Sequence, residues 1–386
     1  MPRPVIVGWG HTPFGRLERD LEGLIHDAGR EALASAGIEA RAIDAIWLGH
    51  FNSGLVDDGF CSSMVLGIDP DLRFKPAVRL ENACASGSAA LFGAMDAIAS
   101  GRVRTALVVG AEKMTALDTA GVTKALGGAS YQREEAGLSF PQVFARFAQA
   151  YAARHGDPTE AMAHIAVKNH DNAMRNPLAQ MHRPLDLDFC RTVSDRNPMI
   201  ADPLKLSDCS LISDGAAALV LVADDMVSDF RHAVGFRAAA QVNDVLPLSA
   251  KDLAAFEGPR RAIVAAFAEA GVGVDDLDLA EVHDCFTIAE LLTVEALGLA
   301  PPGGGRAVIT AGETRRDGRL PINLSGGLKA KGHPVGATGV SMHVLNARQL
   351  TGEAGAMQLP GAELAMAVNM GGGAVATYAT IMQRVR

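Results

Sequence analysis

The sequence has few cysteines, and none of them are spaced as a pair that binds a metal or forms a bridge. The 386 residues include five cysteines, an odd number with no C-x-x-C motif: Cys61, Cys84, Cys190, Cys209 and Cys285. Such a set argues against a disulfide framework and against a structural zinc site. A reducing compartment fits it best, so we expect a cytoplasmic protein.

Long apolar runs and excess positive charge are also missing. No stretch approaches the roughly 18 consecutive apolar residues of a membrane span, and the N-terminal segment reaches Gly and His too early for a signal-peptide core. The net charge is −9, from 35 Lys and Arg against 44 Asp and Glu. Binding of nucleic acid by bulk electrostatics is therefore not expected.

The sequence does contain enough apolar residues, 48% of the chain, to build large cores. Strand-length apolar runs occur at 5–7, 106–109, 216–222, 365–368 and 374–381. Ala-rich helical segments lie between them at 24–36, 88–99, 259–270 and 338–350. This alternation predicts an α/β protein in which helices cover both faces of the sheet.

An internal repeat relates the two halves of the chain. Gly37 aligns with Gly271 at an offset of 234 (271 − 37), and Gly87 with Gly336 at 249 (336 − 87). The match of Gly215 with Gly373 has an offset of only 158 (373 − 215), so the first half holds roughly 91 extra residues (249 − 158). We expect these to form an inserted lid that includes the polar stretch KNHDNAMRNPLAQMHRP.

Cys84 is the first candidate for chemistry. It lies in the segment NACASGSAA, just before an expected helix. The positive end of the helix dipole favours a thiolate, which is the nucleophilic form of cysteine. The alternative is a small buried residue where a helix packs tightly.

His333 lies in GGLKAKGHPVGATG, and the repeat places it opposite Cys84. If the halves pack about a pseudo-twofold axis, the two helix starts face each other. A Cys–His pair makes a thiol nucleophilic at neutral pH. A lone His before Pro is otherwise a common turn residue.

Two further segments carry candidate groups. His283 and Cys285 follow an expected strand in EVHDCF, where α/β folds place their sites, although strand-end packing or a metal site are alternatives. The run Gly371–Gly373 follows another strand and exposes N–H groups that suit an oxyanion. A phosphate cradle is the competing interpretation of that run, but no nucleotide-loop pattern accompanies it.

Taken together, these four segments resemble motifs of the thiolase superfamily, in the right order and across essentially the whole chain. HDCF resembles the subclass related to sterol-carrier-protein thiolases, where better-known thiolases have Asn-Glu-Ala-Phe. The resemblance implies a thiolase fold, with two repeated βαβαβαββ halves in a layered αβαβα arrangement. It places the first half at residues 1–115 and 206–230, the inserted loop domain at 116–205 and the second half at 231–386.

The resemblance also implies an acyl-CoA C-acyltransferase that forms or cleaves 3-oxoacyl-CoA, with a place in lipid metabolism. Cys84 would carry the acyl group, His333 would take its proton, and His283 with His333 would polarise a second thioester. The N–H groups of Cys84 and Gly371 would form the oxyanion hole. Thiolases carry a second cysteine where this chain has Asn369, so Cys285 is the candidate acid/base.

Coenzyme A thioesters are the implied substrates, with no permanently bound cofactor and no metal. The implied assembly is a homodimer or homotetramer, and a small accessory protein is possible. Two alternatives stay open: a partner-dependent acyltransferase or retro-aldolase on a bulky substrate, and a non-catalytic thiolase-fold subunit. Basic residues near the motifs are potential CoA contacts, and none of them is assigned: Lys168, Arg175, His182, Arg183, Arg191, Arg196, Lys329 and Lys331.

Overall fold

The computed structural model describes all residues from Met1 to Arg386. The strands are β1 (Pro4–His11), β2 (Ala45–Gly49), β3 (Ala77–Leu80), β4 (Thr105–Glu112), β5 (Met199–Ala201), β6 (Leu204–Lys205), β7 (Gly215–Ala223), β8 (Val234–Asn243), β9 (Leu279–Val282), β10 (Leu364–Gly371) and β11 (Ala376–Arg384). The helices are α1 (Leu21–Ala36), α2 (Ser86–Ala99), α3 (Thr119–Gly127), α4 (Gln132–Glu135), α5 (Phe140–His155), α6 (Thr159–Ala173), α7 (Leu187–Arg191), α8 (Glu257–Ala270), α9 (Thr287–Ala296), α10 (Gly305–Thr310) and α11 (Val335–Thr351). None of these helices is both long and apolar enough to cross a membrane.

The nine-stranded sheet has two halves with matching strand orders. Its order is β3-β2-β4-β7-β1-β8-β11-β10-β9, so β1 and β8 meet in the middle. Only two residue pairs join them, Val5 with Gly235 and Ile6 with Val234. Beyond β9, Ile322 makes a single bridge to Ala280, in the place that β3 holds in the first half. The halves are therefore related by an approximate twofold axis, as the repeat predicted.

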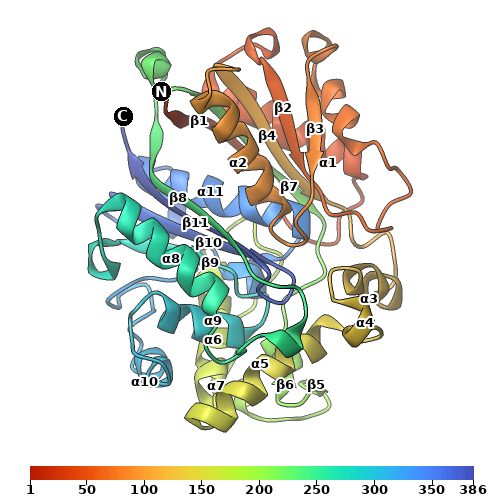
Figure 1. Ribbon diagram of the computed structural model, residues 1–386, viewed down its shortest axis with the longest axis vertical. Coiled ribbons are helices and arrows are strands. Elements are labelled where there is room, and N and C mark those ends of the chain that lie inside the picture. The colour runs from red at the N-terminus through yellow and green to blue at the C-terminus, as the bar shows by residue number, and fades with distance from the viewer.

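Helices form layers around the two half-sheets. Helix α1 packs on the first half, in a core with β1, β2, β4 and β7. Helix α8 covers the second half, and Figure 1 shows it in front of β8–β11 while α2 lies in front of the first half. Helices α2 and α11 share one core with strands of both halves. This arrangement confirms the predicted layered α/β thiolase fold.

The repeat alignment is confirmed at two of its three places. Gly37 and Gly271 both end their helices in the left-handed conformation, at φ of 70° and 66°. Helices α2 and α11 begin at Ser86 and Val335, again 249 residues apart (335 − 86). The third match was wrong by three residues. The equivalent strands β7 and β11 begin at Gly215 and Ala376, an offset of 161 (376 − 215), because the glycine run ends β10 and enters the turn before β11.

The extra residues of the first half lie between β4 and β7. This connection spans 102 residues, 113–214, against four residues, 372–375, between β10 and β11. The excess is 98 (102 − 4), somewhat more than predicted, and it holds α3 to α7 with the short hairpin of β5 and β6. The domain boundaries given above, 116 and 205, lie inside this stretch and stay a prediction.

Helices α2 and α11 approach so closely at their N-termini that only glycine fits. A Cβ placed on Gly87 would lie 2.7 Å from the Gly336 carbonyl oxygen and 2.9 Å from the Val340 nitrogen. Both neighbours are backbone atoms, which yield little. This contact sets the separation of the two helix starts and of the residues just before them.

We predict that Gly87→Ala destabilises the protein by about 1–3 kcal/mol, because the added methyl group overpacks a backbone contact. Urea unfolding followed by circular dichroism measures the change. Gly59→Ala is the matched control, since nothing lies within 4 Å of a Cβ there. Equal stability of the two variants would contradict the packing described here.

Candidate active site

Cys84 lies on a tight turn that leads directly into α2. Ala83 has a φ of 51°, a left-handed conformation that is strained for a residue with a side chain. The turn is held by the Ala85 N–H donating to the Asn82 carbonyl at 3.0 Å and by the Ser86 hydroxyl donating to the Ala83 carbonyl at 2.6 Å. These hydrogen bonds hold the strained turn in place and so fix the backbone position of Cys84.

The structure brings Cys84, His283 and His333 together. The sulfur and one ring nitrogen of each histidine all lie within 4.8 Å of one another. The two imidazole rings are 5.0 Å apart and nearly perpendicular, at 86°. All three side chains are buried. Residues from three distant parts of the sequence thus form one compact cluster.

The hydrogen bonds of His333 define which of its nitrogens is free. The Thr338 hydroxyl, 2.7 Å from Nδ1, already donates its proton to the Pro334 carbonyl at 3.0 Å. It must therefore accept the Nδ1–H of His333. This leaves Nε2 with its lone pair, and Nε2 is buried without a hydrogen-bond partner.

Burial and the charge of Lys331 keep His333 neutral. Burial, followed by the positive charge of Lys331, lowers its pKa to about 3. Burial also lowers the pKa of His283 well below its usual range, with His333 and Lys331 acting in the same direction. At neutral pH both rings are uncharged, so the free Nε2 of His333 is able to accept a proton.

Burial also decides the state of Cys84, against the sequence expectation of a thiolate. The backbone N–H groups of Gly372 and Cys84 favour the thiolate, but burial outweighs them and raises the pKa of Cys84 to about 12. The expectation was wrong because the helix dipole acts on a thiol from which water is excluded. In the free protein Cys84 is a neutral thiol beside a neutral imidazole.

Cys285 is buried close to this cluster. Burial raises the pKa of its thiol well above the usual range, and ionisation of Cys84 or Asp284 nearby acts in the same direction. The thiol therefore holds its proton in the free protein. Cys285 therefore lies close to Cys84 but cannot act as a base until it has lost its proton.

The glycine run packs directly against the turn that carries Cys84. A Cβ on Gly371 would overlap the Asn82 carbonyl oxygen and lie 3.2 Å from the Ala85 nitrogen, so no other residue fits there. The backbone N–H of the next residue, Gly372, favours the ionised form of Cys84 and so acts to lower the pKa of its thiol. The oxyanion role predicted for Gly371 stays a prediction, and Gly372 is an additional donor that the sequence alone did not single out.

The aspartate of HDCF, Asp284, links the segment that carries His283 to the turn before His333 and to helix α6. Asp284 accepts the Leu328 N–H at 2.6 Å and the Lys329 N–H at 3.2 Å, within the turn that precedes His333. It also accepts from the Asn169 side chain of α6 at 2.7 Å. On the same helix, Lys168 forms a buried ion pair with Glu290 at 2.6 Å. The segment between β4 and β7 is thus anchored beneath the site.

Three of the basic residues considered for coenzyme A are not on the surface. Lys168, Lys329 and Lys331 are at most 4% exposed. Lys331 donates to Ser341 at 2.9 Å and lies over the Phe14 ring. Their charge acts on the interior of the site, and they do not form a surface patch for a phosphate.

Sequence and structure comparisons agree with this geometry. Residues 4–225 match the family "Thiolase, N-terminal domain", and residues 240–384 match "Thiolase C-terminal domain-like". An acetyl-CoA acetyltransferase of Methanothermobacter thermautotrophicus is 39% identical over 372 residues, covering 95% of this chain and 96% of that protein. Human sterol carrier protein 2 is 33% identical over 402 residues, covering 97% of this chain and 71% of that protein. Among solved structures, the Ltp2-ChsH2(DUF35) aldolase has a TM-score of 0.83 at 23% identity, covering 100% of this chain and 98% of that chain.

The chain belongs to the thiolase family. Within that family it is a thiolase-type acyl-CoA acyltransferase, as the motifs predicted. Relatives named sterol carrier protein 2 confirm the expected likeness to that subclass.

The raised pKa of Cys84 predicts how its reactivity changes with pH. With a pKa of about 12, the thiolate of Cys84 is a minor form at neutral pH. We therefore expect the alkylation rate of Cys84 to rise about tenfold per pH unit between about pH 7 and pH 9, with no plateau. Iodoacetamide labelling of the free protein, followed by peptide mass spectrometry, measures the rate, with free glutathione as the reference thiol. A plateau below about pH 8 would show instead that the helix dipole dominates.

Proposed function

We propose that the protein forms and cleaves 3-oxoacyl-CoA through an acyl group carried on Cys84, with acetyl as the acyl group. The observation that carries the proposal is the Cys84 thiol within 4.8 Å of a histidine pair whose member His333 keeps an unpartnered Nε2. Relatives named acetyl-CoA acetyltransferase support acetyl-CoA as the substrate.

In the first half-reaction the Cys84 sulfur attacks the thioester carbon while its proton moves to Nε2 of His333. The N–H groups of Cys84 and Gly371 hold the oxyanion that forms. Collapse of this intermediate breaks the bond to CoA sulfur, and Cys285 gives the leaving thiolate its proton. The products are free CoA, acyl-Cys84, a Cys285 thiolate and a protonated His333.

In the second half-reaction the Cys285 thiolate removes an α-proton from a second acyl-CoA. His283 and the protonated His333 donate to the oxygen of the enolate. The enolate carbon attacks the acyl carbon, and the Cys84 sulfur leaves and recovers its proton from His333. The 3-oxoacyl-CoA departs, every group is back in its starting state, and thiolysis is the same sequence in reverse.

The packing around Cys84 supports a small acyl group. Its thiol belongs to a buried apolar cluster that includes Phe51, Met114 and Val335. Val122 and Ala125 of α3 complete it from the segment between β4 and β7. An acetyl group needs little rearrangement of such a cluster, whereas a long chain would have to displace core side chains.

We predict that incubation with acetyl-CoA adds one acetyl group to Cys84, and that Cys84→Ala abolishes both the adduct and turnover without unfolding the protein. Cys285→Ala should still form the adduct, more slowly because water must protonate the departing CoA thiolate, and should lower the condensation rate by about 10²–10⁴-fold, because the base for the α-proton is lost. Intact-protein mass spectrometry and a coupled CoA-release assay measure the two steps. Cys190→Ala, in a separate apolar cluster, is the control.

Full condensation activity in Cys285→Ala would contradict the acid/base assignment, and absence of any adduct in the native protein would contradict the proposal as a whole. The retro-aldolase alternative requires no acyl-enzyme, so it predicts that no adduct forms on Cys84. A partner-dependent reaction is favoured by one observation, the shared fold with the Ltp2-ChsH2(DUF35) aldolase, whose name includes a second protein. Thiolysis of acetoacetyl-CoA by the isolated chain distinguishes a self-sufficient enzyme from a partner-dependent one.

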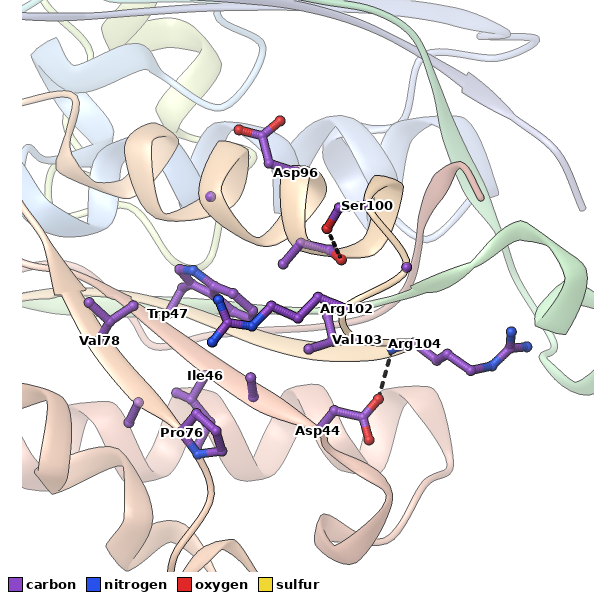
Figure 2. Close-up of a pocket in the computed structure, with 15 residues that line it drawn as sticks. Asp44, Ile46, Trp47, Pro76, Val78, Asp96, Ser100, Arg102, Val103 and Arg104 are labelled. Atoms are coloured by element: carbon purple, nitrogen blue, oxygen red, sulfur yellow. Dashed lines mark hydrogen bonds between the residues drawn. The ribbon is translucent and has the colours of Figure 1, made fainter. Parts of the chain in front are cut away.

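We also propose that the chain forms homodimers through the open edge at β3. This strand pairs only with β2, and Val78 on it is 44% exposed. A surface cavity of about 1000 Å³ lies between this edge and the end of α2, and Figure 2 shows Trp47, Val78 and Arg102 side by side within it. A second copy adding its own β3 would satisfy the unpaired backbone groups.

If this edge is the interface, Val78→Lys should shift the protein from dimer to monomer, because the added charge is costly to bury between paired strands. Sedimentation equilibrium measures the state. Val264→Lys, on an exposed position of α8, is the matched control and should leave the dimer intact. An unchanged dimer in Val78→Lys would place the interface elsewhere.

A cytoplasmic location and a role in lipid metabolism belong to the same proposal. All five cysteines are free thiols, which suits a reducing compartment. Thioesters of CoA are the carriers on which fatty-acyl chains are built and degraded.

A further inference from the structure

Asn369 lies in β10 at the centre of the catalytic cluster, and neither half-reaction gives it a role. Its side chain is 1% exposed and has three polar contacts. Oδ1 is 2.9 Å from the Ser88 hydroxyl, while Nδ2 is 3.3 Å from the Cys84 carbonyl and 2.9 Å from Nδ1 of His283. One amide therefore contacts both the nucleophile's backbone and a catalytic imidazole.

These contacts fix which end of the amide faces His283. The Cys84 carbonyl oxygen is only able to accept, so the amide group opposite it must be the NH₂. The Ser88 hydroxyl donates to the oxygen at the other end. The second hydrogen of Nδ2 then points at Nδ1 of His283, which has to accept it.

A neutral imidazole that accepts at Nδ1 carries its proton on Nε2. We infer that Asn369 is a positioning residue that holds His283 as the Nε2–H tautomer, the reverse of the Nδ1–H tautomer that Thr338 imposes on His333. Two chemically identical side chains thereby receive opposite roles. His283 presents a donor to the substrate oxygen, and His333 presents an acceptor to the Cys84 thiol.

The same arrangement bears on metal binding. Cysteine and histidine are zinc-ligand types, and the three clustered side chains are close enough to share an ion. A nitrogen that carries a proton has no lone pair to give to a metal. With Nε2 protonated and Nδ1 engaged by Asn369, His283 is held as a hydrogen-bond donor and the cluster is kept available for acyl chemistry.

The tautomer of His283 is a property of the free protein, whereas its effect on rate rests on the proposed function. The direct test is nitrogen-15 NMR of protein labelled at histidine, in which protonated and unprotonated ring nitrogens have well-separated shifts. His283→Gln identifies the His283 signals. We expect His283 with a proton on Nε2 and His333 with a proton on Nδ1.

Asn369→Asp should reverse the tautomer of His283, because a carboxylate accepts the Nδ1 proton and does not donate. The condensation rate should then fall about 10²–10³-fold, the loss seen when one oxyanion donor is removed, while the acetyl adduct on Cys84 still forms. Asn369→Leu, which neither donates nor accepts, should show a mixture of tautomers and an intermediate rate. Asn172→Asp, a buried amide that donates to the Asn323 carbonyl, should leave the His283 signals unchanged.

A wild-type His283 with its proton on Nδ1 overturns the inference, as does an Asn369→Asp variant with a reversed tautomer and an unchanged condensation rate. If the tautomers are as expected but no acyl adduct forms on Cys84, the proposed function fails and the assignment of Asn369 as the group that orients His283 stands. The wild-type spectrum decides the first point even if a variant does not fold.

Discussion

The contact between the starts of α2 and α11 is the constraint on which the site depends. The backbone of one helix lies against the backbone of the other at Gly87 and Gly336, with Gly110 of β4 closing the third side. Buried Glu112 secures the same place by accepting the Gly336 N–H and the Phe51 N–H, each at 3.0 Å. Since Cys84 precedes one helix and His333 the other, the separation of the helices determines the separation of sulfur and imidazole.

Burial is the second determinant, and it favours the uncharged form of Cys84, His333 and Asp284. It raises the pKa of the Cys84 thiol and lowers that of the His333 imidazole, so the resting pair is uncharged. Burial also raises the pKa of Asp284 to about 7, with Glu290 acting in the same direction. Charge on the Cys84 and His333 pair therefore develops only during the reaction, when the Gly372 N–H favours the negative form of the sulfur.

The sequence alone predicted the two-half fold and the pairing of Cys84 with His333 because both are recorded in the repeat. Cys84 and His333 hold equivalent positions before equivalent helices, so the spacing of Gly87 and Gly336 was enough to place them together. His283 joined them because its strand, β9, lies beside β10 in the same sheet. Local glycine and proline patterns therefore indicate well where helices begin and which residues precede them.

Other features depend on long-range contacts that no local pattern records. Asn369 sets the tautomer of His283 from 86 residues away, whereas Thr338 sets that of His333 from within the same motif. The protonation state of Cys84 depended on how much water the whole fold excludes, and the helix dipole alone gave the wrong sign. The glycine run was misaligned by three residues because it ends β10 and enters the turn before β11, whereas Gly215 begins its strand.

The second half-reaction requires a thioester whose oxygen reaches the Nε2–H of His283 while its α-carbon faces the acyl group on Cys84. A crystal structure of the Cys84→Ala variant with acetyl-CoA tests this arrangement most directly. We expect the thioester oxygen within about 3 Å of Nε2 of His283, a normal hydrogen-bond distance, with its α-carbon directed toward residue 84. A thioester bound with its oxygen turned away from both histidines, or bound outside the cluster, would contradict the account.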